Sequence, residues 1–126
     1  MVTWILLALI LAMLAWMGFN YLRIRRAAKI VDNEEFEALI RTGQLIDLRE
    51  PAEFHRKHIL GARNIPSSQL KTSLAALRKE KPVLLYENQR AQRVTNAALY
   101  LKKQGFSEIY ILSYGLDSWK GKVKTN

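Results

Sequence analysis

The sequence predicts an α/β domain with an open parallel sheet flanked by helices, preceded by one N-terminal transmembrane helix. The first 22 residues carry no charged side chain. After them, short apolar runs that are typical of buried strands alternate with segments of helical spacing. Such alternation favours parallel pairing and a sheet covered on both faces. At 126 residues the chain accommodates one compact domain in addition to the apolar segment.

The N-terminal apolar segment is long enough to cross a bilayer. In a helix at ~1.5 Å per residue, its 22 residues span roughly 33 Å, which covers the hydrocarbon core. Trp4 lies near one end, and Trp16 and Tyr21 lie near the other, as is typical of interfacial aromatic residues. A cleaved signal peptide would carry its positive charge before the apolar run, and a buried core helix would need a larger domain around it. We therefore expect a transmembrane anchor over residues 1–22.

Basic residues follow the apolar segment at once, namely Arg23, Arg25, Arg26 and Lys29. We interpret residues 23–29 as a juxtamembrane linker and residues 30–126 as the domain. By the positive-inside rule, the domain then lies in the cytoplasm, and the N-terminus lies outside the cell membrane.

The charge of the domain suits a position near an anionic membrane surface. The chain has a net charge of +9, and four of its 20 basic residues precede residue 30, so 16 basic and 11 acidic residues leave +5 for the remainder. No nucleic-acid recognition motif or basic stripe with interleaved aromatic residues occurs, so nucleic-acid binding is not expected. His55 and His58 have no further ligand-type residue at metal spacing, and we expect neither a metal nor a cofactor.

Local signals define the elements in the first half of the domain. The expected elements are a strand over 28–31, a helix over 32–43, a strand over 45–48, a short helix over 51–57 and a loop over 58–66. Asp32 and Glu35 resemble a capping box at the start of the first helix, and Gly43 ends it. Pro51 suits the first turn of the second helix.

The second half continues the alternation. The expected elements are a helix carrying Leu70, Leu74 and Leu77, a strand over 83–86, a helix carrying Val94, Ala97, Ala98 and Leu101, a strand over 109–112 and a helical turn over 115–119. Ser67 or Ser68 can cap the first of these helices, and Gly105 ends the second. We expect the tail, residues 120–126, to be a solvated end.

The loop between the strand over 83–86 and the following helix is the candidate functional element. It comprises Glu87, Asn88, Gln89, Arg90, Ala91, Gln92 and Arg93. Free backbone N–H groups converge where a strand passes through a loop into a helix, and they suit anions and nucleophiles. Arg90 and Arg93 are candidate anion ligands. An arginine that is solvated or paired with Glu87 is the simpler interpretation.

The segment LIDLREPAEFHRKHILGARNIP resembles the rhodanese-homology domain. The ordered matches are Ile46, Asp47, Arg49, Glu53, Phe54, His58, Ile59, Gly61, Ala62, Asn64, Ile65 and Pro66. The later PVLLY, LKKQGF and Gly115 with Trp119 match in order too, so the resemblance covers roughly residues 30–122. Together with the anchor, it is a resemblance to membrane-anchored bacterial members of the family.

This resemblance implies a sheet of about five parallel strands, with the active loop after the fourth. Family sulfurtransferases place a cysteine first in that loop, where it accepts sulfur as a persulfide, and related phosphatases use the same cysteine on phosphate. The motif residues expected to be structural are Asp47, Arg49, His58, Gly61, Asn64, Pro66, Gly115 and Trp119. We expect Asp47 and Arg49 to hold adjacent loops and His58 to fix its loop by a hydrogen bond.

The sequence departs from the family in this loop, because the chain contains no cysteine. This absence excludes disulfides, thiolate-ligated metal sites and thiol mechanisms. Counted from the preceding strand, the cysteine position is Glu87 and the family's arginine falls on Gln92. Counted back from the helix, the positions are Asn88 and Arg93, and we favour this register because it retains the arginine. A second departure is Tyr114, where many relatives carry the first glycine of a pair.

The degenerate loop therefore has no catalytic residue in our interpretation. Asparagine is not a usable nucleophile, and the carboxylate of Glu87 would repel sulfur or phosphate anions. We expect Glu87 to cap the following turn or to pair with Arg90 or Arg93. The predicted function is a catalytically inactive binding or regulatory module for a protein partner or a small anion. Alternatives are a sulfurtransferase-type or sulfur-carrier role with a cysteine from a partner, and a domain that is only a spacer.

Overall fold

A five-stranded sheet forms the centre of the domain in the computed structural model, which describes residues 1–89 and 92–125, with Ile24 described by its backbone alone. The strand order is β1-β6-β5-β2-β4, and every neighbouring pair is parallel. The strands are β1 (Lys29–Val31), β2 (Gln44–Asp47), β4 (Arg63–Asn64), β5 (Val83–Tyr86) and β6 (Ile109–Leu112). The predicted parallel α/β fold is confirmed, and β5 is the fourth strand of this sheet along the chain.

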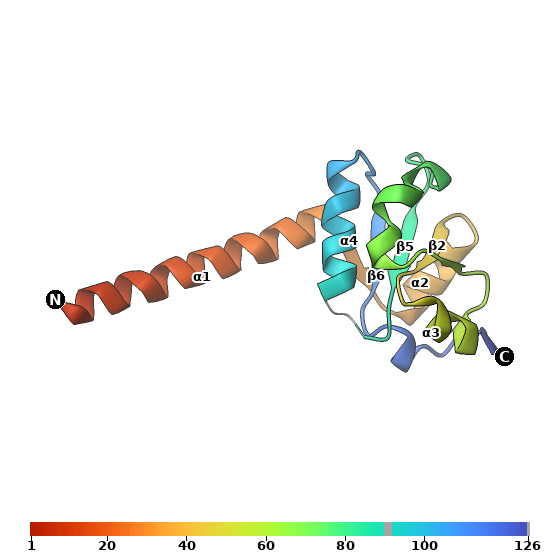
Figure 1. The fold of residues 1–126 in the computed structure, drawn as a ribbon, viewed down its shortest axis with the longest axis horizontal. Coiled ribbons are helices and arrows are strands. Elements are labelled where there is room, and N and C mark those ends of the chain that lie inside the picture. Colours follow the sequence, from red (N-terminus) through yellow and green to blue (C-terminus); the bar gives the residue numbers. More distant parts are fainter. Residues whose placement is uncertain (90–91, 126) are drawn as a thin grey trace.

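One long helix, α1 (Val2–Ala27), projects from the domain (Figure 1). Its apolar stretch is long and apolar enough to cross a membrane, and it is fully exposed in the isolated chain. The helix continues through the basic residues that we expected to form a linker. Ala27 and Ala28 are buried where the chain enters the domain, so the base of α1 is packed against it.

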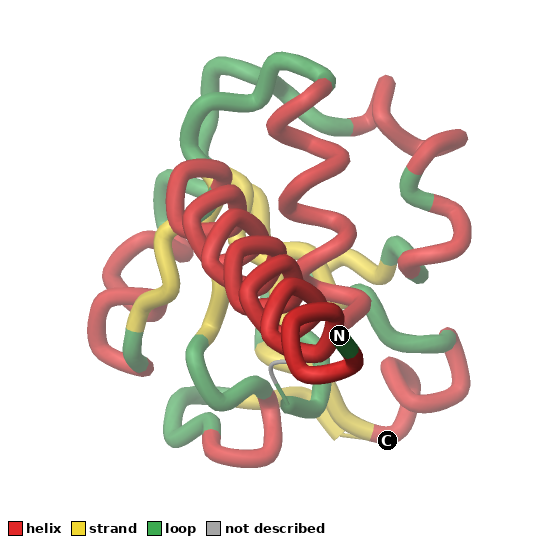
Figure 2. The backbone as a smooth tube through the Cα atoms, turned by 90° about the vertical axis from the view of Figure 1, so that its left-hand side faces the viewer, coloured by secondary structure: helices red, strands yellow, loops and turns green. Residues whose placement is uncertain are grey.

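Helices cover both faces of the sheet (Figure 2). On one face lies α2 (Asn33–Ile40), and on the other lie α4 (Gln92–Lys103) and the 3₁₀ helices η1 (Ser67–Gln69) and η2 (Lys71–Ala76). Leu84 and Tyr86 of β5 belong to the apolar cluster of α2, whereas Val83 and Leu85 belong to that of α4. Successive side chains of a strand point to opposite faces, so both faces of β5 require apolar residues.

The helix termini follow the local signals. Asp32 is the N-cap of α2, and its carboxylate accepts a hydrogen bond from the backbone N–H of Glu35 at 2.9 Å. Pro51 occupies the first turn of α3 (Pro51–Arg56), as predicted. The turn expected near residue 115 is the 3₁₀ helix η3 (Leu116–Ser118). These elements connect the strands by short segments and position the loops at the edge of the sheet.

Two segments that we predicted to be irregular form strands. The expected loop over 58–66 contains most of β3 (Lys57–Ile59) and all of β4, and the expected solvated tail contains β7 (Val123–Thr125). β3 and β7 pair antiparallel, with Ile59 opposite Val123. Strands this short show no alternation, and their pairing joins residues that are distant in sequence. Local patterns therefore could not reveal them.

The helix predicted around Leu70 to Leu77 also differs in kind. It consists of η1 and η2, whose bonds link residues three apart. Pro66 is the N-cap of η1, and no side chain caps it, so the expected cap from Ser67 or Ser68 is wrong. Leucines three and four residues apart fit an α-helix and a 3₁₀ helix almost equally well, which explains the error.

Candidate functional site at the ends of β2 and β5

The C-terminal ends of β2 and β5 lie side by side, because Asp47 and Tyr86 are register partners in neighbouring parallel strands. The segments that follow the two strands meet at this edge of the sheet. A cavity of about 470 Å³ opens there, lined by Arg49, Glu53, Arg56, Lys57, Asn88, Leu116 and Asp117. Open α/β sheets bind ligands at this edge.

Glu87 is the first residue after β5, and its side chain turns toward α4. The residue is 8% exposed, and its Oε2 accepts a hydrogen bond from the backbone N–H of Val94 at 2.9 Å. Val94 is the third residue of α4, so its N–H has no acceptor within the helix. The carboxylate satisfies this donor and places negative charge at the positive end of the helix dipole. Among the ion pairs between described residues, none joins Glu87 to an arginine.

Asn88 turns the other way, toward the cavity. Its Oδ1 accepts a hydrogen bond from Arg49 Nη1 at 3.0 Å, and its Nδ2 donates to Glu53 Oε2 at 2.8 Å. The amide therefore bridges the segment after β2 and helix α3. The two residues that the alternative registers equate with the family's cysteine thus lie in different environments. Only Glu87 has its side chain at the start of α4.

Asp47 and Arg49 form a buried ion pair at the end of β2, with 0% and 5% exposure. Arg49 Nη2 lies 2.9 Å from Asp47 Oδ2, and Arg49 Nε donates to Asp47 Oδ1 at 3.1 Å. Arg49 Nη2 also donates to the carbonyl oxygen of Lys57. Burial by itself lowers the pKa of Arg49, but the hydrogen bond to Asp47 and its charge outweigh burial, and the pKa is raised.

Asn64 and Tyr86 attach neighbouring strands to this pair. Asn64 Nδ2 donates to the carbonyl oxygens of Asp47 at 3.2 Å and Arg49 at 2.9 Å. The hydroxyl of Tyr86 accepts a hydrogen bond from the backbone N–H of Ile59 at 3.1 Å. Burial raises the pKa of Tyr86 above its usual value, and the charge of Asp47 raises it further. The phenol is therefore neutral and serves as a fixed hydrogen-bonding group.

Gly115 lies in close contact with the backbone of the loop after β5. It has a φ of +70°, and a Cβ built on it would lie 2.4 Å from the carbonyl oxygen of Asn88 and 2.5 Å from that of Glu87. The next two residues hold the same carbonyls, because Leu116 N–H donates to Glu87 at 2.8 Å and Asp117 N–H to Asn88 at 3.0 Å. Only glycine fits this position without displacing the loop.

The remaining motif residues lie around the site as packing and turn elements. His58 stacks on Phe54 with ring centroids 3.8 Å apart, and its Nδ1 lies 2.8 Å from the Phe54 carbonyl oxygen. Trp119 packs edge-on against Phe36 at 5.8 Å. Gly61 has a φ of +90°, and Pro66 is buried at the start of η1.

Of the two arginines that we singled out, only Arg93 is described, and it does not line this cavity. Arg90, with Ala91, lies outside the described residues. Arg93 is exposed and lines a separate groove along α4. Gln92 donates to Asn96 on the same helix at 2.8 Å, and exposed Gln89 lies 3.4 Å from Asp117 Oδ2. The structure thus separates Arg93 from the ends of β2 and β5.

Five of the seven residues that line the cavity received no role from the sequence, among them Glu53 and Asp117. Glu53 is one of the ordered motif matches, so the motif itself was the available signal. Asp117 lies between Gly115 and Trp119, but nothing local indicates that its N–H reaches Asn88. That contact arises from the parallel neighbours β5 and β6, which bring the two loops together.

Comparison with known proteins agrees with this geometry. A family model described as a rhodanese-like domain matches residues 32–122. An uncharacterized protein of Bacillus subtilis, YqhL, is 47% identical over 120 residues, covering 95% of this chain and 94% of that protein. The thiosulfate sulfurtransferase GlpE of Stutzerimonas stutzeri is 34% identical over 95 residues, covering 73% and 84%.

Solved structures show the same fold. A rhodanese-related protein from Thermoplasma volcanium superposes with a TM-score of 0.70 at 23% identity, covering 78% of this chain and 99% of that one. A rhodanese-like domain protein from Staphylococcus aureus gives a TM-score of 0.69 at 18% identity, covering 78% and 98%. The residues that the family model matches include four of the five strands of the sheet and the loop after β5, and the chain belongs to the rhodanese-like domain family.

Proposed function

We propose that this chain is a membrane-anchored rhodanese-like protein whose domain binds a protein partner and does not itself transfer sulfur. The capping contact of Glu87 is the observation that carries the proposal. Its carboxylate accepts the hydrogen bond of an N-terminal amide of α4, a donor of the kind that stabilises a thiolate or a bound anion. Persulfide chemistry needs a sulfur nucleophile, and this chain has none.

The cavity beside the loop supports a protein partner in preference to a small anion. Three basic residues, Arg49, Arg56 and Lys57, line it together with the carboxylates of Glu53 and Asp117. Arg49 is already paired with Asp47, which reduces its attraction for a further anion. A polar segment carrying charges of both signs matches this lining better than an isolated anion does.

We further propose that α1 crosses the cell membrane and that the domain lies in the cytoplasm. The apolar stretch of α1 ends just before Arg23, Arg25 and Arg26, and this asymmetry favours a cytoplasmic C-terminal side. Protease added to intact cells should leave the domain uncut, and protease added to inverted vesicles should digest it. Digestion of the domain in intact cells would contradict this orientation.

The test of the inactive assignment uses full-length protein in detergent micelles. We expect no thiosulfate:cyanide sulfurtransferase turnover and no covalent sulfur adduct by mass spectrometry after incubation with thiosulfate. The variant Glu87→Cys should acquire a sulfur adduct, because its thiol would lie at the start of α4. The matched variant Asn88→Cys should acquire far less, because that side chain points into the cavity. Turnover by the wild-type protein would overturn the proposal.

A second candidate function is sulfur carriage with a cysteine supplied by the partner. The identity of 34% to a protein named as a thiosulfate sulfurtransferase favours it, as does the open cavity next to the loop. To test this, the cysteines of a partner captured by cross-linking would be blocked by alkylation, and its binding to this chain would be measured again. Unchanged binding supports the simple binding module, whereas lost binding together with sulfur label on the partner supports sulfur carriage.

A further inference from the structure

We propose that a groove between α1, α4 and the 3₁₀ helices η1 and η2 binds the headgroup of an anionic phospholipid. This inference rests on the proposal that α1 crosses a bilayer. The groove has a volume of about 850 Å³, within the range of roughly 300–1,000 Å³ that is usual for small-molecule sites. It is separate from the cavity at the ends of β2 and β5, since the two share no lining residue.

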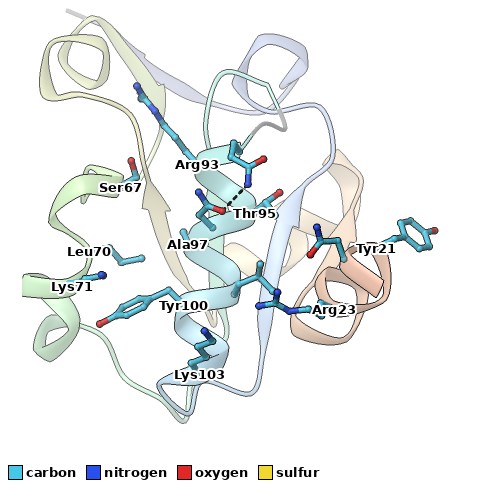
Figure 3. A pocket seen from close by; sticks show the side chains of 14 residues that line it. Tyr21, Arg23, Ser67, Leu70, Lys71, Arg93, Thr95, Ala97, Tyr100 and Lys103 are labelled. Carbon is cyan, nitrogen blue, oxygen red and sulfur yellow. Dashed lines mark hydrogen bonds between the residues drawn. The ribbon is translucent and has the colours of Figure 1, made fainter. Parts of the chain in front are cut away.

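The charge of the groove has one sign. Four basic residues line it, namely Arg23, Lys71, Arg93 and Lys103, and none of its described lining residues is acidic. Figure 3 shows α4 in the middle, with Ser67 and Lys71 on one side and Arg23 of α1 on the other. The groove therefore collects cations from three segments that are far apart in the sequence, namely α1, η2 and α4.

The four cations form no ion pair with another described residue. The ion pairs found between described residues involve other side chains, and none joins these four to a carboxylate. Lys71 lies 5.6 Å from the ring centroid of Tyr100, and Arg23 lies 5.8 Å from that of Phe19. For Lys71 and Arg23, these contacts with aromatic faces leave the N–H groups available for an oxygen ligand.

The position of the groove selects a lipid as the occupant. Asn20 and Tyr21 line it, and they lie on α1 at the point where the apolar stretch gives way to basic residues. In Figure 1, α4 runs along the side of the domain from which α1 projects, and the two helices are in contact. A bilayer around α1 therefore places headgroups at the mouth of the groove.

The uncharged lining also suits a phospholipid. Ser67 and Asn96 offer hydrogen-bonding groups for the hydroxyls or carbonyls of a glycerol backbone, and Leu70 and Tyr100 provide apolar surface beside the cations. Figure 3 shows Leu70 and Tyr100 on the same side of α4 as Lys71. A free phosphate would use only the charges, whereas an anionic phospholipid would use both kinds of surface.

The test is native mass spectrometry of the full-length protein released from detergent, titrated with phosphatidylglycerol or phosphatidylcholine. We expect selective retention of phosphatidylglycerol. The groove variant Lys71→Gln/Lys103→Gln should bind it at least about fivefold more weakly. The control Lys79→Gln/Lys102→Gln removes the same charge from exposed sites outside the groove, with Lys102 adjacent to Lys103 on α4, and should bind as the wild type does.

The outcomes separate the lipid site from general attraction. The charge-retaining variant Lys71→Arg/Lys103→Arg should restore binding, which shows that the loss is not a folding defect. Equal weakening in groove and control variants, or equal retention of phosphatidylcholine, would overturn the proposal. Displacement of the lipid by glycerol 3-phosphate alone would overturn the lipid as occupant. If α1 does not anchor the protein in a membrane, the protein should stay soluble without detergent. This result distinguishes failure of the membrane anchor from failure of the lipid site.

Discussion

The ends of β2 and β5 place polar side chains at the same edge of the sheet, but they use them differently. After β2, the side chains of Asp47 and Arg49 bond to each other, to Asn88 and to the backbone at Lys57. After β5, the one described hydrogen bond of the Glu87 carboxylate is to the amide of Val94, at the start of the next helix. The first region is a long-range framework, and the second is a local helix cap.

This difference shows that the residues that hold the loop in place are separate from the residue at position 87. The framework joins β2, β3, the loop after β5 and α3, so it fixes the loop whatever side chain occupies position 87. The cap stabilises only the start of α4, so this side chain can change without dismantling the site. A family scaffold can therefore persist in a chain that has no cysteine.

Breaking the framework should have the largest effect on stability. Arg49→Met leaves the carboxylate of Asp47 buried without its partner, and we expect a loss of about 3–5 kcal/mol in the free energy of unfolding. Urea unfolding of the full-length protein in micelles, followed by circular dichroism, measures it. The control Arg56→Met removes an exposed guanidinium at the same cavity and should change stability by less than about 0.5 kcal/mol. Equal effects of the two variants would show that the buried pair is not a framework.

Removing the helix cap should have a smaller effect. Glu87→Ala leaves the amide of Val94 without an acceptor, and we expect a loss of about 1–2 kcal/mol, measured in the same unfolding experiment. Glu50→Ala is the matched control, because Glu50 is the N-cap residue of α3 but its exposed side chain makes no capping bond. A loss as large as that of Arg49→Met would mean that the loop depends on the cap as much as on the framework.

The sequence was informative wherever structure is local. The capping box at Asp32, Pro51 in the first turn of α3 and the apolar run of β5 each act over a few neighbouring residues, and each is found as predicted. The resemblance to the rhodanese-homology domain extended this to a sheet of about five parallel strands with the loop after the fourth, but not to the order of those strands. The strands that were missed, β3, β4 and β7, exist only through pairing between distant segments.

In the candidate site, too, contacts could be predicted only where they are local in the sequence. That Glu87 would cap a turn was one of two expectations. The donor that its carboxylate binds, the amide of Val94, could be identified only from the position of α4 beside β5. The bond from Asn88 to Glu53 spans 35 residues and has no local signal. Likewise, Arg93 was expected in the loop after β5, yet it belongs to α4 and lines the groove along that helix.

Tyr86 connects the two regions, and its substitution should have the smallest effect. Tyr86→Phe removes the acceptor of the Ile59 amide, and we expect a loss of about 1 kcal/mol at neutral pH. The raised pKa of Tyr86 adds a dependence on pH. The unfolded chain releases this proton near pH ~10 while the folded chain keeps it, so the contribution is complete below that pH and decreases above it. The difference in the free energy of unfolding between the wild type and Tyr86→Phe should therefore fall by about 1.4 kcal/mol per pH unit above ~10 and change sign within about one unit. Urea unfolding at several alkaline pH values tests this. A constant gap would mean that the phenol ionises equally in both states, and that burial beside Asp47 does not hold its proton.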